Sequence, residues 1–379
     1  MTVPRMTEDA AGRKLVVFYL SRPDDFLRTH EGIRLVAIAD TIARLKHYRF
    51  AGRWDESHRH SGRVFFVPDE TLLTPKARQL GIGSADDLFG GVVPYSFART
   101  KAITHSLVGG NAERPEGWSD VFAARIRDVV LPGYTAFSAR DAECAATMLL
   151  ADGCVRVKKP LAAGGVGQRR LQTGAELTAV LETLPADELR ECGLVLETDL
   201  ADVTTLSIGQ VMLDDMTMTY QGTQRLTTDN EGRSAYGGSD LECVRGGWNV
   251  LDRLPLPDDI RQGVAQAKVY DEAMCEYPGF MASRRNYDVG QGLDSRGRWR
   301  SGVFEASWRV GGATAAEVAA LAAFMEDAAG DVINASSVLA FGEEIEPPPG
   351  ARVHFQGDDP ELGPMIQYSL VARVVRRAT

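Results

Sequence analysis

The chain has 379 residues, of which 44% are hydrophobic and 25% are charged, as is typical of a globular protein with two or three domains. Its formal net charge of -10, without a long basic run, argues against a nucleic-acid partner. Five cysteines without a C-x-x-C pair indicate reduced thiols in the cytoplasm, and no apolar run is long enough to cross a membrane.

The first part of the chain is predicted to form a small α/β unit. Two short apolar runs, at residues 15–20 and 64–67, have the composition of buried strands. Residues 33–45 between them carry apolar side chains at helical spacing, and the order strand, helix, strand predicts a parallel sheet. His58 and His60 form an H-x-H pair that could bind a metal, but their polar surroundings favour a solvated loop.

A glycine-rich stretch follows a short strand near the middle of the chain. Residues 155–157 are predicted to form this strand, which Lys158 and Lys159 end. The loop that follows contains three glycines, Gly164, Gly165 and Gly167. Glycine lets the backbone approach a ligand closely, and a neighbouring lysine supplies a charge for phosphate. The loop fits neither familiar phosphate-binding fingerprint, so the pattern alone is compatible with a phosphate-binding loop or with a surface turn.

A helix and a second strand are predicted after this glycine loop. Thr173 and Glu176 form a capping-box pattern, and an apolar helical face continues to Leu184. Residues 193–197 are then predicted to form a buried strand that ends on Glu197. Because the two strands around the helix both end on charged residues, a cleft between them would bring Lys159 close to Glu197. The alternative for Glu197 is a solvated strand end.

The next part of the chain is predicted to be antiparallel sheet. Turn signals at residues 214–215, 230–232 and 237–238 divide residues 203–250 into short strands. The stretch from Tyr236 to Ser239 is interpreted either as a substrate or lid loop or as a flexible hairpin. A helix is expected over residues 258–274.

A turn signal at residues 294–297 predicts a β-hairpin between residues 284 and 309. A turn centred near residue 296 or 297 places Asp288 opposite Glu305, with Cβ atoms about 4.5–5.5 Å apart. Like charges in such a pair are destabilising, and a divalent cation such as Mg²⁺ is the simplest group that offsets their repulsion. Ser307 and Gln291 are further oxygen donors nearby. The alternative is that both acids pair with the arginines of the same stretch.

Together, these three features resemble the ATP-grasp superfamily, in its biotin-carboxylase-like branch. The resemblance covers about residues 131–330, and it rests on Lys159 with the glycine loop, on Glu197, and on Asp288 with the run from Glu305 to Gly312. It implies an α/β (α+β) chain with an ATP-grasp fold and an N-terminal Rossmann-like domain before the grasp. The whole chain is similar to an uncharacterised bacterial family within that superfamily.

The resemblance implies ATP as a ligand and gives roles to residues at matching positions. Lys159 would contact the phosphates of ATP and act in catalysis, and Lys101 would correspond to the basic residue that reaches the nucleotide in relatives. The glycine loop would form a flap over these phosphates. Glu197 would begin the hinge that binds adenine, and Asp202 would hold the ribose.

The resemblance also implies Mg²⁺ and an anionic substrate. Asp288, Glu305 and Ser307 would bind the metal, with Gln291 in reserve. The family pattern after the glutamate is E-x-N, whereas Ser307 stands here, and this departure bears on a second metal ion. Arg309 would face the substrate or the developing negative charge. The candidate anchors for the substrate are Arg225, Arg284, Arg285 and Arg309.

The function implied by the resemblance is that of an ATP- and Mg²⁺-dependent ligase. Such an enzyme activates a carboxylate as an acyl phosphate and passes it to an amine or a similar nucleophile. The alternatives are a nucleotide-binding protein without turnover and an ATP-dependent kinase on the same fold. The expected partner is a small-molecule carboxylate, with no nucleic acid and no membrane, and a homodimer is left open.

Four regions are expected along the chain. Residues 1–130 would form the N-terminal α/β domain, and residues 131–200 the first grasp subdomain with the glycine loop. Residues 201–345 would form the second grasp subdomain with the acidic hairpin. Residues 346–379 would add C-terminal strands packed on the grasp.

Overall fold

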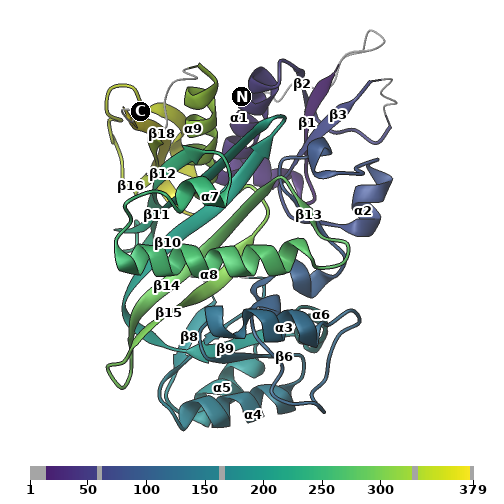
Figure 1. Ribbon diagram of the computed structural model, residues 1–379, viewed down its shortest axis with the longest axis vertical. Helices are drawn as coiled ribbons and strands as arrows, with labels where there is room; N and C mark the ends of the chain where they lie inside the picture. Colours follow the sequence, from purple (N-terminus) through teal and green to yellow (C-terminus); the bar gives the residue numbers. More distant parts are fainter. Residues whose placement is uncertain (1–13, 58–61, 162–166, 327–331, 376–379) are drawn as a thin grey trace.

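A computed structural model describes residues 14–57, 62–161, 167–326 and 332–375 of the protein (Figure 1). The predictions for His58, His60, Gly164 and Gly165 lie outside the described residues. Within the described ranges, no helix combines the length and the apolar character needed to span a bilayer.

The N-terminal unit is a three-stranded parallel sheet in the order β2-β1-β3, with helix α1 packed on it. The two predicted strands and the helix between them are confirmed, and β2 is an additional strand. Helix α1 begins after Thr29, whose side chain accepts the N–H of Gly32. The bounds are β1 Leu15–Tyr19, α1 His30–Leu45, β2 Arg49–Arg53 and β3 Val64–Pro68.

A second small sheet joins the N-terminal unit to a distant part of the chain. Its central strand β5 pairs with β4 on one side and with β13 on the other. Since β13 comes just before the predicted hairpin, this pairing positions the start of the hairpin against the N-terminal unit. The bounds are β4 Leu72–Leu73, α2 Thr74–Gln79, β5 Gly91–Val93 and β13 Met281–Ala282.

The lobe at the bottom of Figure 1 is built on a four-stranded antiparallel sheet in the order β6-β9-β7-β8. One face packs on α4 and α5 through apolar residues such as Val157 and Leu196. Because side chains alternate along a strand, Lys158 and Glu197 lie on the opposite face. The bounds are α3 Asp120–Ile126, β6 Gly133–Ala136, α4 Ala139–Leu150, β7 Val155–Lys158, β8 Gln168–Leu171, α5 Gly174–Leu181, α6 Ala186–Cys192 and β9 Leu194–Thr198.

The rest of the chain is built on an antiparallel sheet in the order β15-β14-β10-β11-β12-β16-β18-β17. Its strands are β10 Leu200–Leu213, β11 Met216–Thr228, β12 Ser234–Arg245, β14 Arg284–Asp294, β15 Trp299–Ser307, β16 Val332–Phe341, β17 Arg352–Asp359 and β18 Gly363–Val375. The helices in this part are α7 Trp248–Leu251, α8 Asp258–Cys275 and α9 Thr314–Glu326.

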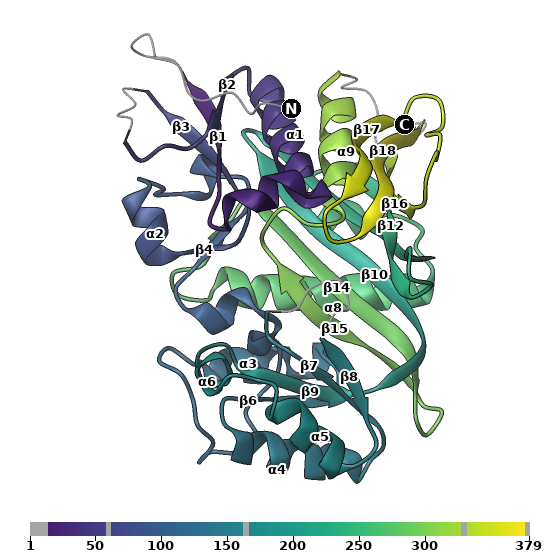
Figure 2. The same ribbon diagram turned by 180° about the vertical axis from the view of Figure 1, so that it is seen from behind.

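Helices cover this large sheet at both ends. Helix α8 runs across β10 and β14 in Figure 1, and its Tyr270 packs in one core with Ile208 and Val289. Helix α9 packs with α1 and with β12 and β16 in a second core. Seen from behind in Figure 2, β14 and β15 lie above β7, β8 and β9 of the lower lobe. The hairpin is therefore held between α8 and the four-stranded sheet.

One sequence prediction needs correction in the large sheet, and another is confirmed. The expected turn at Gly237 and Gly238 is instead part of the long strand β12. The ladder between β11 and β12 shifts register beside these glycines, and Gly238 has a φ of +123°, so the glycine signal marks an irregularity within a strand. The two C-terminal runs are strands as expected, and they extend the large sheet itself.

Candidate functional site

The predicted hairpin is confirmed as β14 and β15, and Asp288 is paired with Glu305 in its register. Its turn is held by Asp294, whose carboxylate accepts the backbone N–H groups of Arg296 and Arg298, each at 3.0 Å. The same carboxylate accepts hydrogen bonds from the side chains of Arg298 at 2.7 Å and Arg300 at 2.9 Å. This turn sets the register of the ladder as far as Val289 and Val303, and a register shift beyond that pair brings Asp288 opposite Glu305.

The two facing carboxylates differ in their electrostatic surroundings. Desolvation and then the charge of Glu305 raise the pKa of Asp288 to about 7. Desolvation also opposes ionisation of Glu305, but the charges of Lys101 and Lys158 outweigh it and lower the pKa of Glu305. The ammonium group of Lys101 lies 3.1 Å from Glu305. The expected repulsion is thus offset here by nearby lysines and by a raised pKa.

Lys158 connects the hairpin with the four-stranded sheet. Its ammonium group lies 2.6 Å from the carboxylate of Glu197 and 4.2 Å from the ring centre of Phe304 on β15. Glu197 also binds His105 at 2.9 Å, and all three charged or polar side chains are buried. For Glu197, desolvation is outweighed by Lys158 and His105, and its pKa is lowered. A buried cluster of charges therefore lies in the interface between the four-stranded sheet and the hairpin.

The expected neighbour of Glu197 was Lys159, and the structure places Lys158 there instead. Lys159 extends from the other side of the strand end, where its ammonium group donates to Thr183 at 3.2 Å. Side chains at successive strand positions point to opposite faces of the sheet, so only one of the two lysines can face the hairpin. The alternation of apolar Val155 and Val157 with Arg156 and Lys158 was the signal that could have identified Lys158.

The remaining predicted nucleotide contacts are placed as follows. Lys101 is buried in the short 3₁₀ helix Lys101–Thr104 and faces the hairpin. Gly167 has a φ of +74°, and its carbonyl accepts the N–H of Lys159. Asp202 is exposed near the start of β10. The roles of the glycine loop as a flap and of Asp202 at a ribose stay predictions.

Of the two further oxygen donors expected near Asp288 and Glu305, Ser307 shares their face of the hairpin and Gln291 is engaged elsewhere. Within the described ranges, no group of three or more His, Cys, Asp or Glu side chains is arranged to hold a metal. Ser307 is paired with Asn286 across the hairpin. This pair lies two positions along the ladder from Asp288 and Glu305, and therefore on the same face. Gln291 is engaged with Ser301 and with the carbonyl of Asp259.

Asn286 is a residue that the sequence analysis missed. It lies two positions before Asp288, and its amide nitrogen donates to Ser207 at 3.1 Å and to Asp288 at 3.4 Å. The ladder thus places an amide opposite Ser307, although the chain lacks the amide of the E-x-N pattern at position 307 itself. The signal was available as the strand position that shares a face with Asp288.

Arg284 has a structural role that the sequence did not indicate. Its guanidinium is 1% exposed and forms two hydrogen bonds with Glu317, at 2.7 and 2.8 Å. It also donates to the carbonyls of Ser307 and Arg309. These contacts hold the chain just after the carboxylate pair, and the role of Arg284 as a substrate anchor stays a prediction.

Two other candidate anchors are also engaged within the protein. Arg285 lies 2.9 Å from Asp271 and donates to Gln210. Arg225 lies 3.0 Å from Asp240 and donates to a backbone carbonyl of β16. Arg309, the fourth candidate, lines a small pocket beside α1. Its positive charge also lowers the pKa of Glu305, so it lies near the carboxylate pair.

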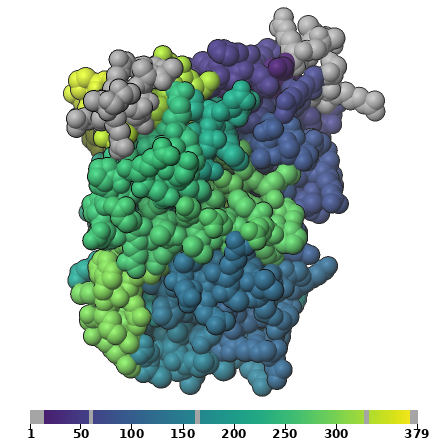
Figure 3. All heavy atoms as spheres, in the orientation of Figure 1, coloured from purple at the N-terminus to yellow at the C-terminus, as the bar shows by residue number. Residues whose placement is uncertain are grey.

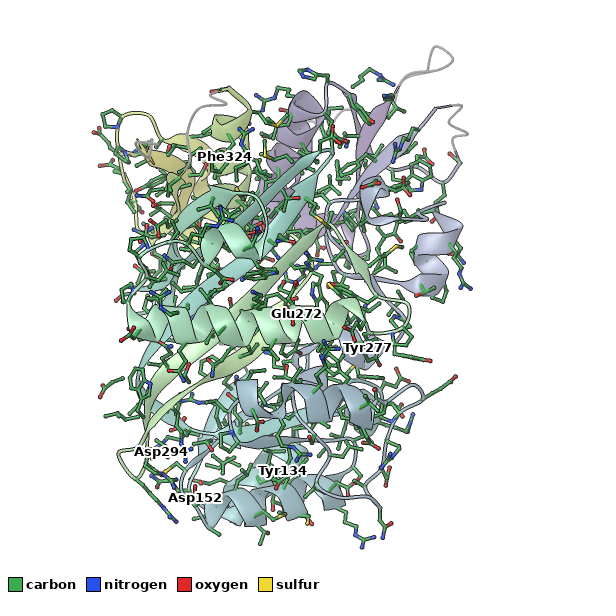
Figure 4. All side chains as sticks on the ribbon, in the orientation of Figure 1. Tyr134, Asp152, Glu272, Tyr277, Asp294 and Phe324 are labelled. Carbon is green, nitrogen blue, oxygen red and sulfur yellow. The ribbon has the colours of Figure 1, made fainter. Side chains whose placement is uncertain are left out.

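The lower lobe contacts the hairpin at its tip as well as through Lys158 and Phe304. Asp152, at the end of α4, pairs with Arg296 and Arg298 of the turn, and Arg298 also contacts Asp294. Figure 4 shows Asp152 and Asp294 near each other at this tip. In the space-filling view, the light green tip lies directly against the blue lobe (Figure 3). The lower lobe and the hairpin are therefore also joined at the turn.

The comparisons with known proteins identify the fold. Residues 18–369 match a sequence family described as "Protein of unknown function (DUF3182)". No curated protein matches the chain. The N5-carboxyaminoimidazole synthetase of Staphylococcus aureus, solved with ADP, is 10% identical, with 98% of this chain and 96% of that chain covered and a TM-score of 0.53.

Two further solved structures agree. The biotin carboxylase domain of the Hydrogenobacter thermophilus 2-oxoglutarate carboxylase, solved with MgADP, ADP and bicarbonate, is 12% identical with a TM-score of 0.50, covering 96% of this chain and 87% of that chain. The N5-carboxyaminoimidazole synthase of Aspergillus clavatus, solved with ADP and an aminoimidazole ribonucleotide, is 10% identical with a TM-score of 0.50, covering 96% and 94%. These are ATP-grasp proteins, and the predicted ATP-grasp fold is confirmed.

Proposed function

This chain belongs to the family described as proteins of unknown function (DUF3182), and we propose that it is an ATP- and Mg²⁺-dependent ligase that activates a carboxylate as an acyl phosphate. The observation that carries the proposal is the cluster of charged side chains between the four-stranded sheet and the hairpin. Asp288 and Glu305 face each other there, with the ammonium groups of Lys101 and Lys158 beside them. In an ATP-grasp fold, this arrangement supports a phosphate and metal site.

The oxygen-rich side chains of the hairpin fit a hard divalent cation. Asp288 and Glu305 would hold Mg²⁺, and the amide oxygen of Asn286 is the additional donor on the same face. Desolvation and then the charge of Glu305 raise the pKa of Asp288, and this supports the fit because a bound cation would offset both effects. When bound, Mg²⁺ would neutralise charge on the transferred phosphoryl group.

The two buried lysines would bind the phosphates of ATP. Lys101 is paired with Glu305, and Lys158 with Glu197, so both ammonium groups are held between the four-stranded sheet and the hairpin. Phosphate oxygens would compete with these carboxylates for the lysine protons that donate hydrogen bonds. Fixed positive charges of this kind stabilise the charge of a phosphoryl group during its transfer. An amine or a similar nucleophile would then attack the acyl phosphate.

The proposal is tested by measuring ADP and phosphate release with Mg·ATP and a panel of small carboxylic and amino acids. Glu305→Gln should lower the acid-dependent turnover at least about a hundredfold, or about 2.7 kcal/mol in the barrier. The thermal shift caused by ATP should persist in part, because Lys158 and the glycine loop are unchanged. An acid-dependent turnover that Glu305→Gln leaves unchanged would contradict the metal assignment.

Two observations favour a second candidate, a nucleotide-binding protein without turnover. Glu305 is already paired with Lys101, and Ser307 stands in place of the amide of the E-x-N pattern. Such a protein would bind ATP and show a thermal shift with it. It would release neither ADP nor phosphate with any acid of the panel, and this result separates it from the ligase.

A further inference from the structure

Strand β15 contains one extra residue where it reaches the carboxylate pair. Val303 is paired with Val289 and Glu305 with Asp288, and the ladder passes over Phe304 between them. An extra residue of this kind is a β-bulge, which re-aims side chains and is frequent beside functional sites. The direction of the side chains around Phe304 thus departs from that of a regular strand.

The bulge turns two successive side chains toward the four-stranded sheet. Val303 belongs to the core that also contains Tyr270 of α8. The ring of Phe304 instead meets the ammonium group of Lys158 on β7, and the charge of Lys158 also acts on Glu305. In a regular strand, Phe304 and Glu305 would point to opposite faces. The bulge thus places an aromatic ring and a carboxylate beside the same lysine.

A glycine on the neighbouring strand makes room for the ring of Phe304. A Cβ atom added at Gly290 of β14 would lie 1.8 Å from Cζ and 2.0 Å from Cε2 of this ring, far inside the contact distance of real atoms. The tip of the ring is therefore held against the backbone of β14, while its face meets the ammonium group of Lys158. Any residue larger than glycine at position 290 would displace the ring.

The ammonium group of Lys158 has two receptors of different kinds. Glu197 on β9 lies 2.6 Å away, and the ring centre of Phe304 on the hairpin lies 4.2 Å away. The side chain of Lys158 is 4% exposed, so water screens neither contact strongly. An aromatic ring attracts a cation without offering a lone pair, whereas a lysine has three N–H donors. The ring can hold the charge in place while N–H groups that Glu197 does not accept serve a ligand.

A second lysine of the chain makes the same kind of contact in a structural setting. Lys46, just after α1, lies 4.3 Å from the ring centre of Phe65 and pairs with Asp214 in the turn between β10 and β11. Phe65 belongs to the core around α1 and α9. The two contacts join the same residue types, but only the one at Phe304 adjoins the carboxylate pair. Phe65 is therefore a matched control for Phe304.

We propose that Phe304 is a positioning residue for the phosphates of the nucleotide, because its ring fixes the ammonium group of Lys158 beside Asp288 and Glu305. The inference rests on the ligase function proposed above, in which Lys158 binds these phosphates. Phe304 itself supplies no ligand to phosphate or metal, and it acts through Lys158. Its ring is presented by the bulge, and Gly290 leaves the space that the ring needs.

Isothermal titration calorimetry with Mg·ADP tests the inference, because binding of this nucleotide needs no turnover. Phe304→Leu keeps an apolar side chain but removes the aromatic face, and it should weaken binding at least about fivefold. Phe304→Tyr keeps the face and should restore the wild-type affinity to within about twofold. Phe65→Leu removes the equivalent contact of Lys46, and the folded variant should bind Mg·ADP as wild type does.

A double-mutant cycle separates an effect through Lys158 from a general effect on the hairpin. Phe304→Leu should cost little further affinity when it is combined with Lys158→Gln, because the partner of the ring is already gone. Combined with Lys159→Gln, it should cost its full factor. Without nucleotide, the changes in melting temperature caused by Phe304→Leu and Lys158→Gln should likewise be non-additive.

Three results would overturn the inference: an unchanged affinity in Phe304→Leu, an equal loss in Phe304→Tyr, or losses that add in full with Lys158→Gln. Phe304→Met is a second apolar variant with the same expected loss, and it replaces Phe304→Leu if that variant does not fold. Wild-type binding of Mg·ADP without any dependence on Phe304 refutes the inference alone. A wild-type protein that binds no Mg·ADP refutes the nucleotide site, and the inference falls with it.

Discussion

At the scale of single residues, the charge cluster between the four-stranded sheet and the hairpin depends on which of two adjacent lysines faces the hairpin. Lys158 is buried between Glu197 and the ring of Phe304, whereas Lys159 donates to Thr183 on the other side. One position along a strand reverses the direction of a side chain. The two lysines therefore form a matched pair for mutation.

We expect Lys158→Arg and Lys158→Gln to reduce the thermal shift caused by Mg·ATP strongly, and Lys159→Gln to preserve most of it. Lys158→Gln also leaves Glu197 buried with only His105, at a cost of roughly 3–5 kcal/mol, so each shift is taken relative to the same variant without ligand. Lys158→Arg retains a charge for Glu197, and it therefore isolates the effect on the nucleotide. Equal losses in the Lys158 and Lys159 variants would contradict the assignment.

The carboxylate pair predicts a pH dependence of metal binding. Desolvation and the charge of Glu305 raise the pKa of Asp288 to about 7, whereas an unfolded Asp titrates at about 3.9. The folded protein holds this proton between about pH 4 and pH 7, so the group's contribution to stability falls as the pH rises through that range. Mg²⁺ competes with the same proton.

The stabilisation by Mg·ADP should therefore grow between about pH 6 and pH 8, as Asp288 loses its proton. Thermal shifts at constant ionic strength measure this growth, and EDTA with ADP provides the metal-free comparison. In Asp288→Asn, the pH dependence of the metal-dependent shift should disappear. A wild-type shift that stays constant or falls over this range would rule out Asp288 as the titrating ligand.

At the scale of elements, the hairpin is organised by its turn. Asp294 accepts two backbone N–H groups and two guanidinium hydrogen bonds, and the turn also reaches Asp152 of the lower lobe. A register slip by one residue would turn Asp288 away from Glu305. The turn and the carboxylate pair are therefore coupled, although they lie at different positions along the hairpin.

Asp294→Ala should destabilise the protein by roughly 1–3 kcal/mol, because it removes the carboxylate that accepts two backbone N–H groups and two guanidinium hydrogen bonds of the turn. Its Mg·ATP shift should also fall, since the hairpin register becomes less well defined. Asp152→Ala is the matched control, and the loss of its exposed ion pairs should change the stability little. Chemical denaturation measures both variants, and equal stability losses would argue against the special role of Asp294.

At the scale of the whole molecule, the two ends of the described chain meet at one side chain. Asp359 at the end of β17 accepts the backbone N–H of His30 at 2.7 Å and lies 2.9 Å from the ring Nδ1 of His30. It also accepts the N–H groups of Glu361 and Leu362. This buried contact holds the start of α1 against the C-terminal strands.

Asp359→Ala should therefore cost roughly 1–3 kcal/mol in the free energy of unfolding, through unsatisfied buried donors. The neighbouring Asp358 is exposed, so Asp358→Ala should have little effect. Urea denaturation followed by circular dichroism compares the two variants. A similar loss of stability in both variants would show that the contact between Asp359 and His30 contributes little to folding.

The sequence by itself determined the features that depend on neighbours along the chain. The strand and helix periodicities of the N-terminal unit, the capping box at Thr173 and the hairpin pairing of Asp288 with Glu305 are local patterns, and the structure has them. The ordered set of motifs was also enough to predict the ATP-grasp fold, which is confirmed. The boundaries of the domains and most roles at the site stay predictions.

Only the tertiary structure decided which charged side chains meet. Lys158 rather than Lys159 faces the hairpin, because strand β7 packs its valines on α4 and α5 and its alternate side chains point the other way. Arg284 pairs with Glu317 and Arg285 with Asp271, although the two arginines are adjacent in the sequence. An arginine's partners come from elements far along the chain, and burial changes the free energy of its charge by several kcal/mol. Residue type and spacing carry no record of that packing.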